Sequence, residues 1–536
     1  MTGWPFPVPG REYLEKNGTT FRNHQVASQV CSSARSVVYT GQHIQHTGVF
    51  DNMGMPWQAN MSTDVLTIGH RLQQFGYHAA YQGKWHLSEN LAAGHTPVDA
   101  SLRKNREIIE SYGFADFLGV GDVIDGPLGG YSYDDFSTGS AVTWLRTKAH
   151  ALQAKGQPWF LAVNLVNPHD VMWVNSDLPG ETVQGRSHAF PIDRPPANDI
   201  YRAEWDFPLP GTRHQPLDAP GRPAAHLQYQ LSQDIVLGQW PDEDRRWRLL
   251  QDYYFNCIRD CDRHLVQLLE ELKANGFDDK TIVVFTADHG ELGGAHQMRG
   301  KGCNAYKEQN HVPLMIVHPA YPGGESTRAV SSQLDLTPTL LALTGLALTG
   351  LALTGKPAAS IARAGAGLKG RDLSKVLSAP AQASPTTVRP AALFNFNMFS
   401  YLDAAWLGSA VHTFMSKEPR LEKAVKMVAQ QPNWRNRGAI RSIFDGRYRF
   451  SRYFSPIEFN RPTTYEALIA KNDFELYDLQ EDPEETRNLA LDGKAKAGLM
   501  MALNEVLNER IDDEVGVDDG SFLPLLDGFW YPAAMI

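Results

Sequence analysis

The sequence predicts an α/β fold: a large mixed, mostly parallel sheet sandwiched by helices, with a smaller C-terminal α+β domain on a short antiparallel sheet. Continuous apolar runs of strand length occur at Trp159–Leu165, Thr281–Ala287 and Val312–Val317, with helical patterns between them. Wholly apolar strands that alternate with helices are typical of a sheet covered on both faces. The 536 residues are enough for two domains, which we expect at 1–375 and 390–536.

The composition is that of an ordinary soluble globular protein, with 42% hydrophobic and 21% charged residues. A formal net charge of −10 gives no electrostatic reason to expect nucleic acid as a partner. No apolar run is long enough to span a membrane, and the start lacks the basic flank and apolar segment of a signal peptide. Four cysteines make a disulfide framework improbable for so long a chain. We therefore expect a cytoplasmic protein.

Start and stop signals place the next elements in chain order. Ser62–Thr63 predicts the start of a helix that Gly76 ends, and 78–82 has the pattern of a short strand. A long amphipathic helix is predicted over 245–274, where Cys257 and Cys261 are expected to be packed thiols.

Two segments lack regular periodicity. Residues 175–240 are rich in Pro, Gly, Asp and His, which is typical either of a pocket-forming insertion or of a surface excursion. Thr337–Pro338 starts a helix, after which Leu-Ala-Leu-Thr-Gly occurs three times over 341–355. Because each five-residue step turns a helix by about 140°, the copies cannot share one face, and we expect a local expansion of a helix end. The Pro/Ala/Ser-rich stretch 356–392 is the candidate linker.

The C-terminal part has strand and helix signals of its own. The segment 440–454 predicts a hairpin turning at Asp445–Gly446, 474–479 a further strand, and 495–510 a closing helix. The tail 522–536 is unusually apolar and is expected to dock on the body or on a neighbouring subunit, so a homo-oligomer is one expectation.

Cys31 and Arg35 form the first candidate site. The thiol precedes a predicted helix start, where unpaired N–H groups and the positive dipole end favour an anionic group. A nucleophile beside a guanidinium suits sulfuryl or phosphoryl transfer. A buried structural cysteine is the alternative for this motif alone.

Further chemistry-bearing groups follow predicted strands. Asp288 and His289 can bind a divalent cation through a carboxylate oxygen and an imidazole nitrogen, although Asp288 could equally cap a turn. Lys301 stands on a glycine-rich loop, and the remaining groups suit anion binding and proton transfer. These remaining groups are Lys84, His86 and His169. Each alone has a structural explanation, but together they favour a catalytic centre.

In order and spacing, these motifs resemble the type I sulfatase family of the alkaline-phosphatase-like superfamily, near its choline-sulfatase and phosphonate monoester hydrolase branch. The motifs are Cys31…Arg35…Gly41, Gly83-Lys84-Trp85-His86, Asn167-Pro168-His169, Asp288-His289-Gly290 and Lys301 before His311. The resemblance runs from about residue 10 to 490, and Leu476-Tyr-Asp-Leu-Gln-Glu-Asp-Pro483 belongs to it. It implies a sulfuric ester hydrolase acting on a small-molecule sulfate ester.

The resemblance also implies roles for single residues. A formylglycine-generating enzyme would oxidise Cys31 to formylglycine, whose hydrate is the nucleophile, and Arg35 would hold that hydrate. Calcium, or another divalent cation such as Mg or Mn, would be bound by Asp288 and His289 together with the side chain at position 31. The other implied roles are sulfate binding by Lys84 and Lys301, proton transfer by His86 and His169, and substrate binding by Asn52.

Two departures from the family pattern keep alternatives open. The family's first strand, which ends in an acidic pair of metal ligands, is not found before Cys31, where Glu12 and Glu15 fall in a helix-like segment. Ser33 also stands where formylglycine-generating enzymes favour Pro or Ala. The alternatives are a phosphonate monoester or phosphodiester hydrolase, a chain that starts at an internal methionine, and a metal-poor inactive relative that only binds anionic esters.

Overall fold

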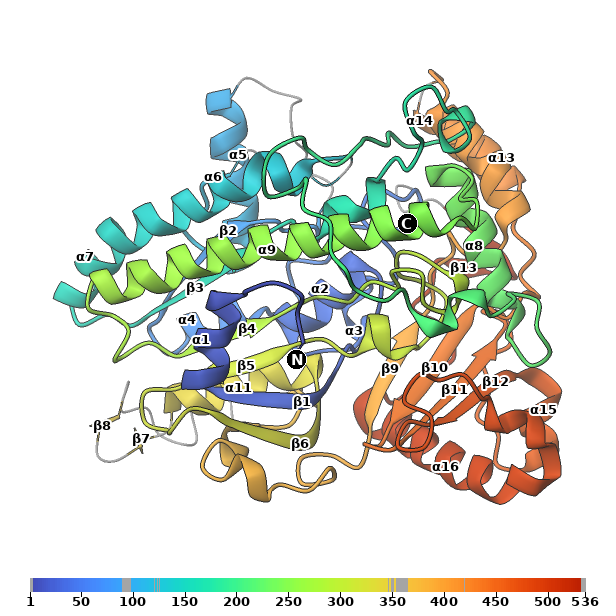
Figure 1. The fold of residues 1–536 in the computed structure, drawn as a ribbon. Helices are drawn as coiled ribbons and strands as arrows, with labels where there is room; N and C mark the ends of the chain where they lie inside the picture. The colour runs from blue at the N-terminus through green and yellow to red at the C-terminus, as the bar shows by residue number, and fades with distance from the viewer. Residues whose placement is uncertain are drawn as a thin grey trace.

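The computed structural model describes residues 3–88, 98–119, 121–122, 124, 126–345, 347–348, 351–352, 365–418 and 420–531. Strands of the N-terminal part lie beneath a layer of long helices, and a separate C-terminal sheet lies beside them (Figure 1). This is the α/β arrangement with an added antiparallel sheet that the sequence predicts, but the described N-terminal strands form separate sheets instead of one large sheet, and only β1 and β6 pair in parallel in the larger one.

Two sheets occupy the N-terminal part. The larger has the strand order β4-β5-β1-β6, in which β1 is parallel to β6, and β5 is antiparallel to β1 and β4. The smaller pairs β2 and β3 in parallel register from His78 opposite Trp159 to Gly83 opposite Asn164. Their bounds are β1 Thr19–Gln25, β2 His78–Gly83, β3 Trp159–Asn164, β4 Val283–Thr286, β5 Leu314–Val317 and β6 Glu325–Ser332.

The expectation that no sheet strand precedes Cys31 is wrong. β1 precedes it and lies inside the larger sheet, between β5 and β6. Its mixed sequence, Thr-Thr-Phe-Arg-Asn-His-Gln, has neither a continuous apolar run nor strict alternation, so periodicity does not reveal it. No Asp or Glu occurs between Thr19 and Val30. β1 therefore does not supply the acidic pair.

The prediction that two of the apolar strands are fully buried is also wrong. Ala162 is buried in β3, but the other residues of β3 and all four of β4 are only half-buried. β3 and β4 each end a sheet among the described strands, so one edge of each is unpaired. An unpaired edge leaves apolar side chains partly accessible, whatever their hydrophobicity.

Helices cover these sheets. The predicted long helix is α9, which runs beside α6 across the strands in Figure 1. The helix predicted from Ser62–Thr63 starts later, because Thr67 caps it by accepting the N–H of His70. The helices are α1 Pro9–Asn17, α2 Cys31–Thr40, α3 Ile44–Thr47, α4 Ile68–Gln73, α5 Val98–Ser111, α6 Gly129–Trp144, α7 His150–Ala154, α8 Ala224–Leu237, α9 Asp244–Ala274, α10 Lys307–Asn310 and α11 Leu336–Gly345.

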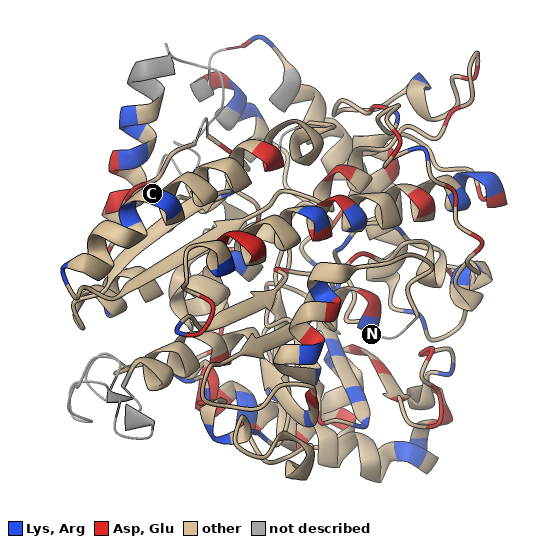
Figure 2. Ribbon diagram, turned by 60° about the vertical axis from the view of Figure 1, so that its left-hand side comes forward, with Lys and Arg blue, Asp and Glu red and all other residues tan. Residues whose placement is uncertain are grey.

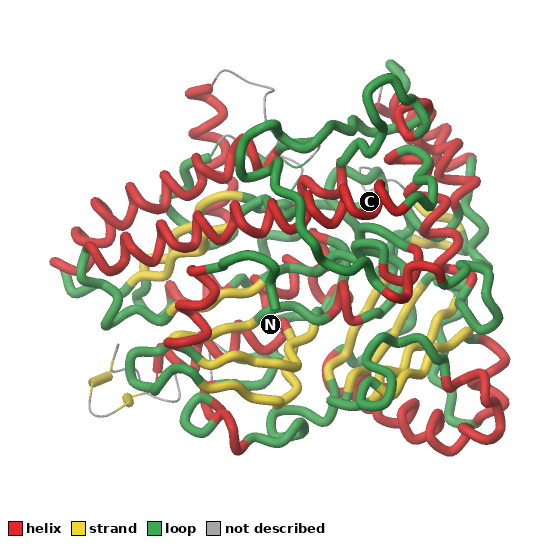
Figure 3. The backbone as a smooth tube through the Cα atoms, in the orientation of Figure 1, coloured by secondary structure: helices red, strands yellow, loops and turns green. Residues whose placement is uncertain are grey.

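Much of 175–240 is irregular, as predicted, and Figure 3 shows it mostly as loop before α8. α11 ends within the first copy of the pentapeptide repeat, and most of the other two copies lies outside the described residues. The predicted linker is described only from 365 onward. Leu373 and Leu377 are buried there in a core cluster with Phe21, so this part packs on the body instead of running free.

The C-terminal sheet has the order β12-β11-β10-β9 and is antiparallel throughout. The predicted hairpin is confirmed as β10 and β11, with Gly446 at a φ of +99° in its turn. The elements are β9 Ala392–Phe396, β10 Ala439–Phe444, β11 Tyr448–Phe454, β12 Asp473–Asp478, α13 Ala404–Met415, α14 Arg420–Ala429, α15 Tyr465–Lys471 and α16 Ala497–Glu514.

The described part of the apolar tail docks on the body of its own chain. It forms the short hairpin of β13 Leu525–Leu526 and β14 Phe529–Trp530, and Trp530 is fully buried. Its ring meets Trp57 edge to face, with centroids 5.5 Å apart. Residues 532–536 of the tail lie outside the described residues.

None of the described helices combines the length and apolar character needed to cross a membrane. In the view of Figure 2, basic and acidic residues are interspersed over the helices and loops instead of gathering in one patch of a single sign. This distribution agrees with the mildly negative net charge of the sequence.

Candidate active site

Cys31 is the first residue of α2 and stands where several loops meet. Its side chain is 1% exposed, and its Sγ lies 3.0 Å from His289 Nε2. The start of α2 has no capping side chain at Val30, but Asn52 Oδ1 accepts the N–H of Ser32 at 3.3 Å. Asn52 therefore holds the helix start beside the thiol.

Asp288 and His289 follow β4 directly. The Oδ1 of Asp288 accepts the backbone N–H of His289, and its Oδ2 lies 3.8 Å from both Lys84 Nζ and Arg35 Nη1. His289 Nδ1 is 2.9 Å from the carbonyl oxygen of Gly290, which leaves Nε2 for the thiol. Asp288 is thus surrounded by cationic side chains.

Most nitrogens of the Arg35 guanidinium donate hydrogen bonds to oxygen atoms of the protein. Nε donates to the carbonyl oxygen of Trp85 at 2.8 Å, and Nη2 donates to Tyr81 Oη at 2.6 Å and to Asn164 Oδ1 at 3.0 Å. These bonds tie α2 to the ends of β2 and β3. Arg35 therefore positions neighbouring groups, and it meets the candidate site mainly through Nη1 and Asp288.

Lys84 and His86 stand on the loop after β2. Both are buried, and His86 has a left-handed φ of 55°. Asp122 fixes this loop, because its two carboxylate oxygens accept the N–H groups of Trp85 at 2.6 Å and His86 at 2.8 Å. No local sequence motif marks Asp122 as a residue of the site.

His169 follows β3 on the short helix η2 (His169–Trp173). Its Nε2 lies 3.1 Å from both the Ile124 carbonyl oxygen and Trp173 Nε1, whereas Nδ1 is buried without a hydrogen-bond partner in the structure. Asp134 on α6 accepts the N–H groups of Val166 and Asn167 and so fixes the loop before it. Asp134 likewise stands in no local motif that marks it in the sequence.

Lys301 is buried, and its Nζ lies 3.1 Å from Met172 Sδ, a weak acceptor. Gln309 Oε1 accepts the N–H of Gly302 at 3.0 Å, and Glu291 accepts that of Gly300 at 2.5 Å. The loop is thus fixed on both sides of Lys301. Among the described residues, no carboxylate pairs with its ammonium group, whose hydrogen-bond partner is Met172 Sδ.

The electrostatics of the site favour negative charge. Burial opposes ionisation of Cys31, yet Lys301, Lys84 and His289 hold the pKa of its thiol well below the ordinary value. Burial would also raise the pKa of Asp288, but His289, Lys84 and Arg35 lower it. Burial and the Lys84 charge lower the pKa of His169 to about 4. The site can therefore hold an anion beside position 31.

The same residues do not fit a calcium ion. Cys31, Asp288 and His289 offer one ligand atom each within 4.8 Å of one another, and they are the group of potential ligands that the described residues place here. Calcium takes six to eight oxygen ligands, whereas this set provides one carboxylate, already shared with Lys84 and Arg35. The structure therefore brings the three predicted metal ligands together, but they offer a divalent cation fewer ligand atoms than calcium takes.

Comparisons with known proteins agree with the motifs. The model of the family described as Sulfatase matches residues 2–346. Arylsulfatase K of Danio rerio is 24% identical over 344 residues, covering 63% of this chain and 60% of that protein. Choline-sulfatase of Rhizobium meliloti is 27% identical over 362 residues, covering 63% of each. The chain thus matches less than two thirds of the length of these relatives.

Solved structures show the same fold. A 2-O GAG sulfatase superposes with a TM-score of 0.62 at 18% identity, covering 95% of this chain and 87% of that one. The architecture is the alkaline-phosphatase-like fold, with mixed sheets between helices and a small antiparallel C-terminal sheet. The family match extends over more than half of the chain and includes Cys31 and the Asp288–His289 motif. The chain belongs to the sulfatase family.

Proposed function

We propose that this protein hydrolyses a small-molecule sulfate monoester, with the side chain at position 31 as nucleophile after conversion of Cys31 to formylglycine. Members of the family generally use a formylglycine and a divalent cation. The observation that carries the proposal is the position of Cys31, at the start of a helix and against His289, where Lys84 and Lys301 both favour negative charge.

The cationic groups account for substrate binding. Lys84 and Lys301 can neutralise the sulfate oxygens, because both ammonium groups influence position 31 from a buried, weakly solvated setting. The N–H groups at the start of α2 add a positive dipole end on the same side. A formylglycine hydrate there would supply the attacking oxygen and divide one displacement into two easier steps.

Two imidazoles can serve proton transfer. The Nδ1 atoms of His86 and His169 are both buried without a hydrogen-bond partner in the structure. We assign to His86 the removal of a proton from the nucleophile, and to His169 the donation of a proton to the leaving oxygen. With its pKa lowered to about 4, His169 is neutral at pH 7 before substrate binds. The negative charge of a bound sulfate would raise that pKa and let His169 hold the proton that the leaving oxygen needs.

The test compares sulfate and phosphonate monoesters on one preparation of the full chain, together with mass mapping of the Cys31 peptide. We expect an aldehyde at position 31, hydrolysis of a sulfate ester, and loss of that activity in Cys31→Ala. Cys257→Ala, which removes another buried thiol, should keep the activity. Undiminished hydrolysis by Cys31→Ala would refute the nucleophile, and preference for the phosphonate ester would instead favour the related hydrolase.

One observation favours a second candidate. Among the described residues, three buried cations, Arg35, Lys84 and Lys301, outnumber the carboxylates at the site, which are Asp288 and Asp122, and this balance suits anion binding without a metal. A relative that only binds sulfated esters would therefore hold inorganic sulfate and leave Cys31 as a thiol. Tight sulfate binding without turnover of any ester would establish this candidate.

A further inference from the structure

A second group of potential metal ligands lies away from Cys31. His296, Glu308 and Glu485 offer one ligand atom each, all within 4.8 Å of one another. We call them the junction cluster. His296 and Glu308 lie on either side of Lys301 in sequence, in η5 (Ala295–Gln297) and α10, whereas Glu485 comes from the C-terminal part, after β12.

His296 is oriented as a ligand would be. It is 0% exposed, and its ring stacks on Tyr306 with centroids 3.6 Å apart. Nδ1 lies 2.7 Å from Gln215 Oε1, an acceptor, so Nδ1 carries the hydrogen and Nε2 keeps its lone pair. Metal-bound histidines commonly donate their other ring N–H in this way. Nε2 itself has no hydrogen-bond partner in the structure.

The two carboxylates complete the cluster. Glu308 Oε2 is buried, has no hydrogen-bond partner, and lies 3.8 Å from His296 Nε2, which is longer than a hydrogen bond. Glu485 is 1% exposed and is held by Arg449 Nε and by the N–H of Lys307, both at 2.7 Å. The imidazole lone pair of His296 thus faces the carboxyl oxygens of Glu308 and Glu485.

Other cations approach the cluster from its outer side. Arg449 binds Oε1 of Glu485, Lys307 Nζ lies 3.8 Å from Oε1 of Glu308, and Arg222 donates to the backbone oxygen of His296. None of these contacts uses His296 Nε2 or Glu308 Oε2. A cation between those two atoms would remove the repulsion between their lone pairs.

We propose that the junction cluster binds one zinc-class divalent cation through His296 Nε2 and a carboxylate oxygen from each of Glu308 and Glu485. One imidazole and two carboxylates are a ligand set that zinc accepts, with a water in the fourth position. This site is separate from the Cys31 site and does not depend on the proposed sulfatase activity.

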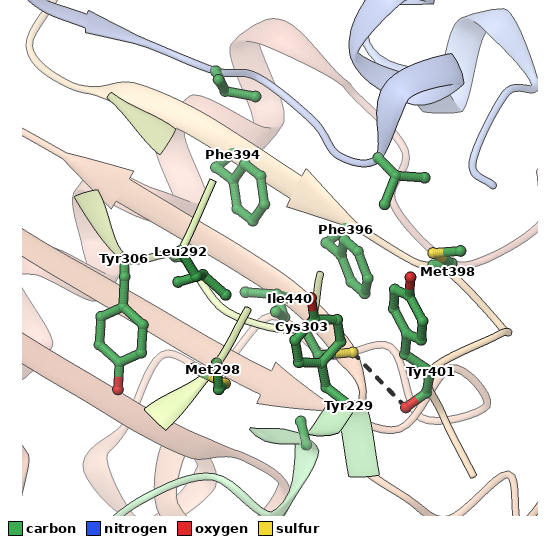
Figure 4. Packing of buried hydrophobic residues seen from close by; sticks show 14 of the residues in the cluster. Tyr229, Leu292, Met298, Cys303, Tyr306, Phe394, Phe396, Met398, Tyr401 and Ile440 are labelled. Atoms are coloured by element: carbon green, nitrogen blue, oxygen red, sulfur yellow. Dashed lines mark hydrogen bonds between the residues drawn. The ribbon is translucent and has the colours of Figure 1, made fainter. Parts of the chain in front are cut away.

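The cluster stands where the Lys301 loop meets the C-terminal sheet. Figure 4 shows Tyr306, Leu292 and Met298 packed with Phe394 and Ile440 of that sheet. A metal bound to His296, Glu308 and Glu485 would join both flanks of the loop to the segment after β12. The expected consequence is a firmer attachment of the loop that carries Lys301, so the metal would have a structural role.

The test uses full-length protein stripped with a chelator and then supplied with Zn²⁺ alone. We expect one tightly bound zinc per chain, a higher melting temperature, and zinc affinity lowered at least about tenfold in Glu308→Gln. Glu308→Gln keeps the size of the side chain, and His296→Asn is a second variant at a left-handed φ that Asn tolerates. Glu484→Gln, at an exposed neighbouring carboxylate, should bind zinc as the unaltered protein does.

Two further measurements separate this site from Cys31. Cys31→Ala should still bind one zinc. In the unaltered protein, Co²⁺ substituted for zinc should give ligand-field bands without a thiolate-to-cobalt charge-transfer band. Equal zinc affinity in Glu308→Gln and the unaltered protein, loss of zinc in Cys31→Ala, or a thiolate band with cobalt would each overturn the proposal, and the cobalt spectrum decides even if a variant fails to fold.

Discussion

At the scale of single residues, the charged side chains of the candidate site differ in how many oppositely charged neighbours they have. Asp288 has two cationic neighbours at 3.8 Å, whereas Lys301 has, among the described residues, only Met172 Sδ within hydrogen-bond distance. An ammonium group that is buried without a carboxylate partner is costly unless an anion joins it during function. Lys301 is therefore the side chain whose charge is most directly available to a sulfate group.

Lys301→Met tests this availability. Removing one preorganised charge that faces the transferred group should lower kcat/KM for a sulfate ester about 100-fold. The alkyl stem is retained, so the melting temperature should stay the same or rise. Lys273→Met, in the exposed last turn of α9, should leave both quantities unchanged. A variant that keeps full kcat/KM would show that Lys301 does not contact the substrate.

At the scale of elements, carboxylates hold the loops that carry the site. Asp122 accepts two backbone N–H groups in the loop after β2, and Asp134 accepts two in the loop after β3. Each lies more than 30 residues from one of the groups it binds. Such contacts depend on the three-dimensional fold, and no spacing in the sequence indicates them.

Asp122→Asn tests the loop after β2. An amide oxygen cannot replace both carboxylate contacts, so we expect the free energy of unfolding to fall by about 1–3 kcal/mol. The fall in kcat/KM should be larger than this loss of stability explains, because Lys84 and His86 both move with the loop. Asp116→Asn is the matched control, since Asp116 pairs with His78 and Lys148 instead of this loop. Equal losses of activity in the two variants would contradict the assignment.

The elements that the sequence predicts well are those with strong local signals. α9 has a helical pattern over 31 residues, and the β10–β11 hairpin has an Asp-Gly turn between its strands. β1 lacks such a pattern and depends on its neighbours β5 and β6. The site residues follow from motif order, whereas the engagement of Arg35 by backbone oxygens could be learned only from the structure.

At the scale of the whole molecule, a buried ion network joins α16 to the N-terminal part. Arg389, which is fully buried, binds Asp335 and donates to Glu514 Oε1 at 2.8 Å. Glu514 also lies 3.1 Å from His43 Nε2. Through His43 the last long helix is fixed to a segment 471 residues earlier in the chain.

Arg389→Met should therefore destabilise the protein strongly. It leaves buried Asp335 without its cation and leaves Glu514 only the more distant Arg510, at 3.9 Å, and removing one partner of a buried ion pair typically costs about 3–5 kcal/mol of unfolding free energy. Arg461→Met provides the comparison, because Arg461 pairs at the surface with Asp512 of α16. Such exposed pairs contribute at most about 1 kcal/mol to the free energy of unfolding. Urea unfolding of both variants measures the difference, and similar losses would show that the buried network does not stabilise the docking of α16.

Buried histidines make the stability of the whole molecule depend on pH. Burial, with the charges of His311 and Arg389, lowers the pKa of His24 to about 3. The unfolded chain therefore binds a proton near pH 6.5 that the folded protein does not bind. The free energy of unfolding that His24 contributes above that pH is lost as the pH falls. Between about pH 7.5 and pH 5 this should remove about 2 kcal/mol of unfolding free energy.

His24→Gln should abolish that share of the loss in urea unfolding, whereas His412→Gln, on the exposed face of α13, should retain it. An unchanged pH dependence in His24→Gln would mean that other groups govern acid sensitivity.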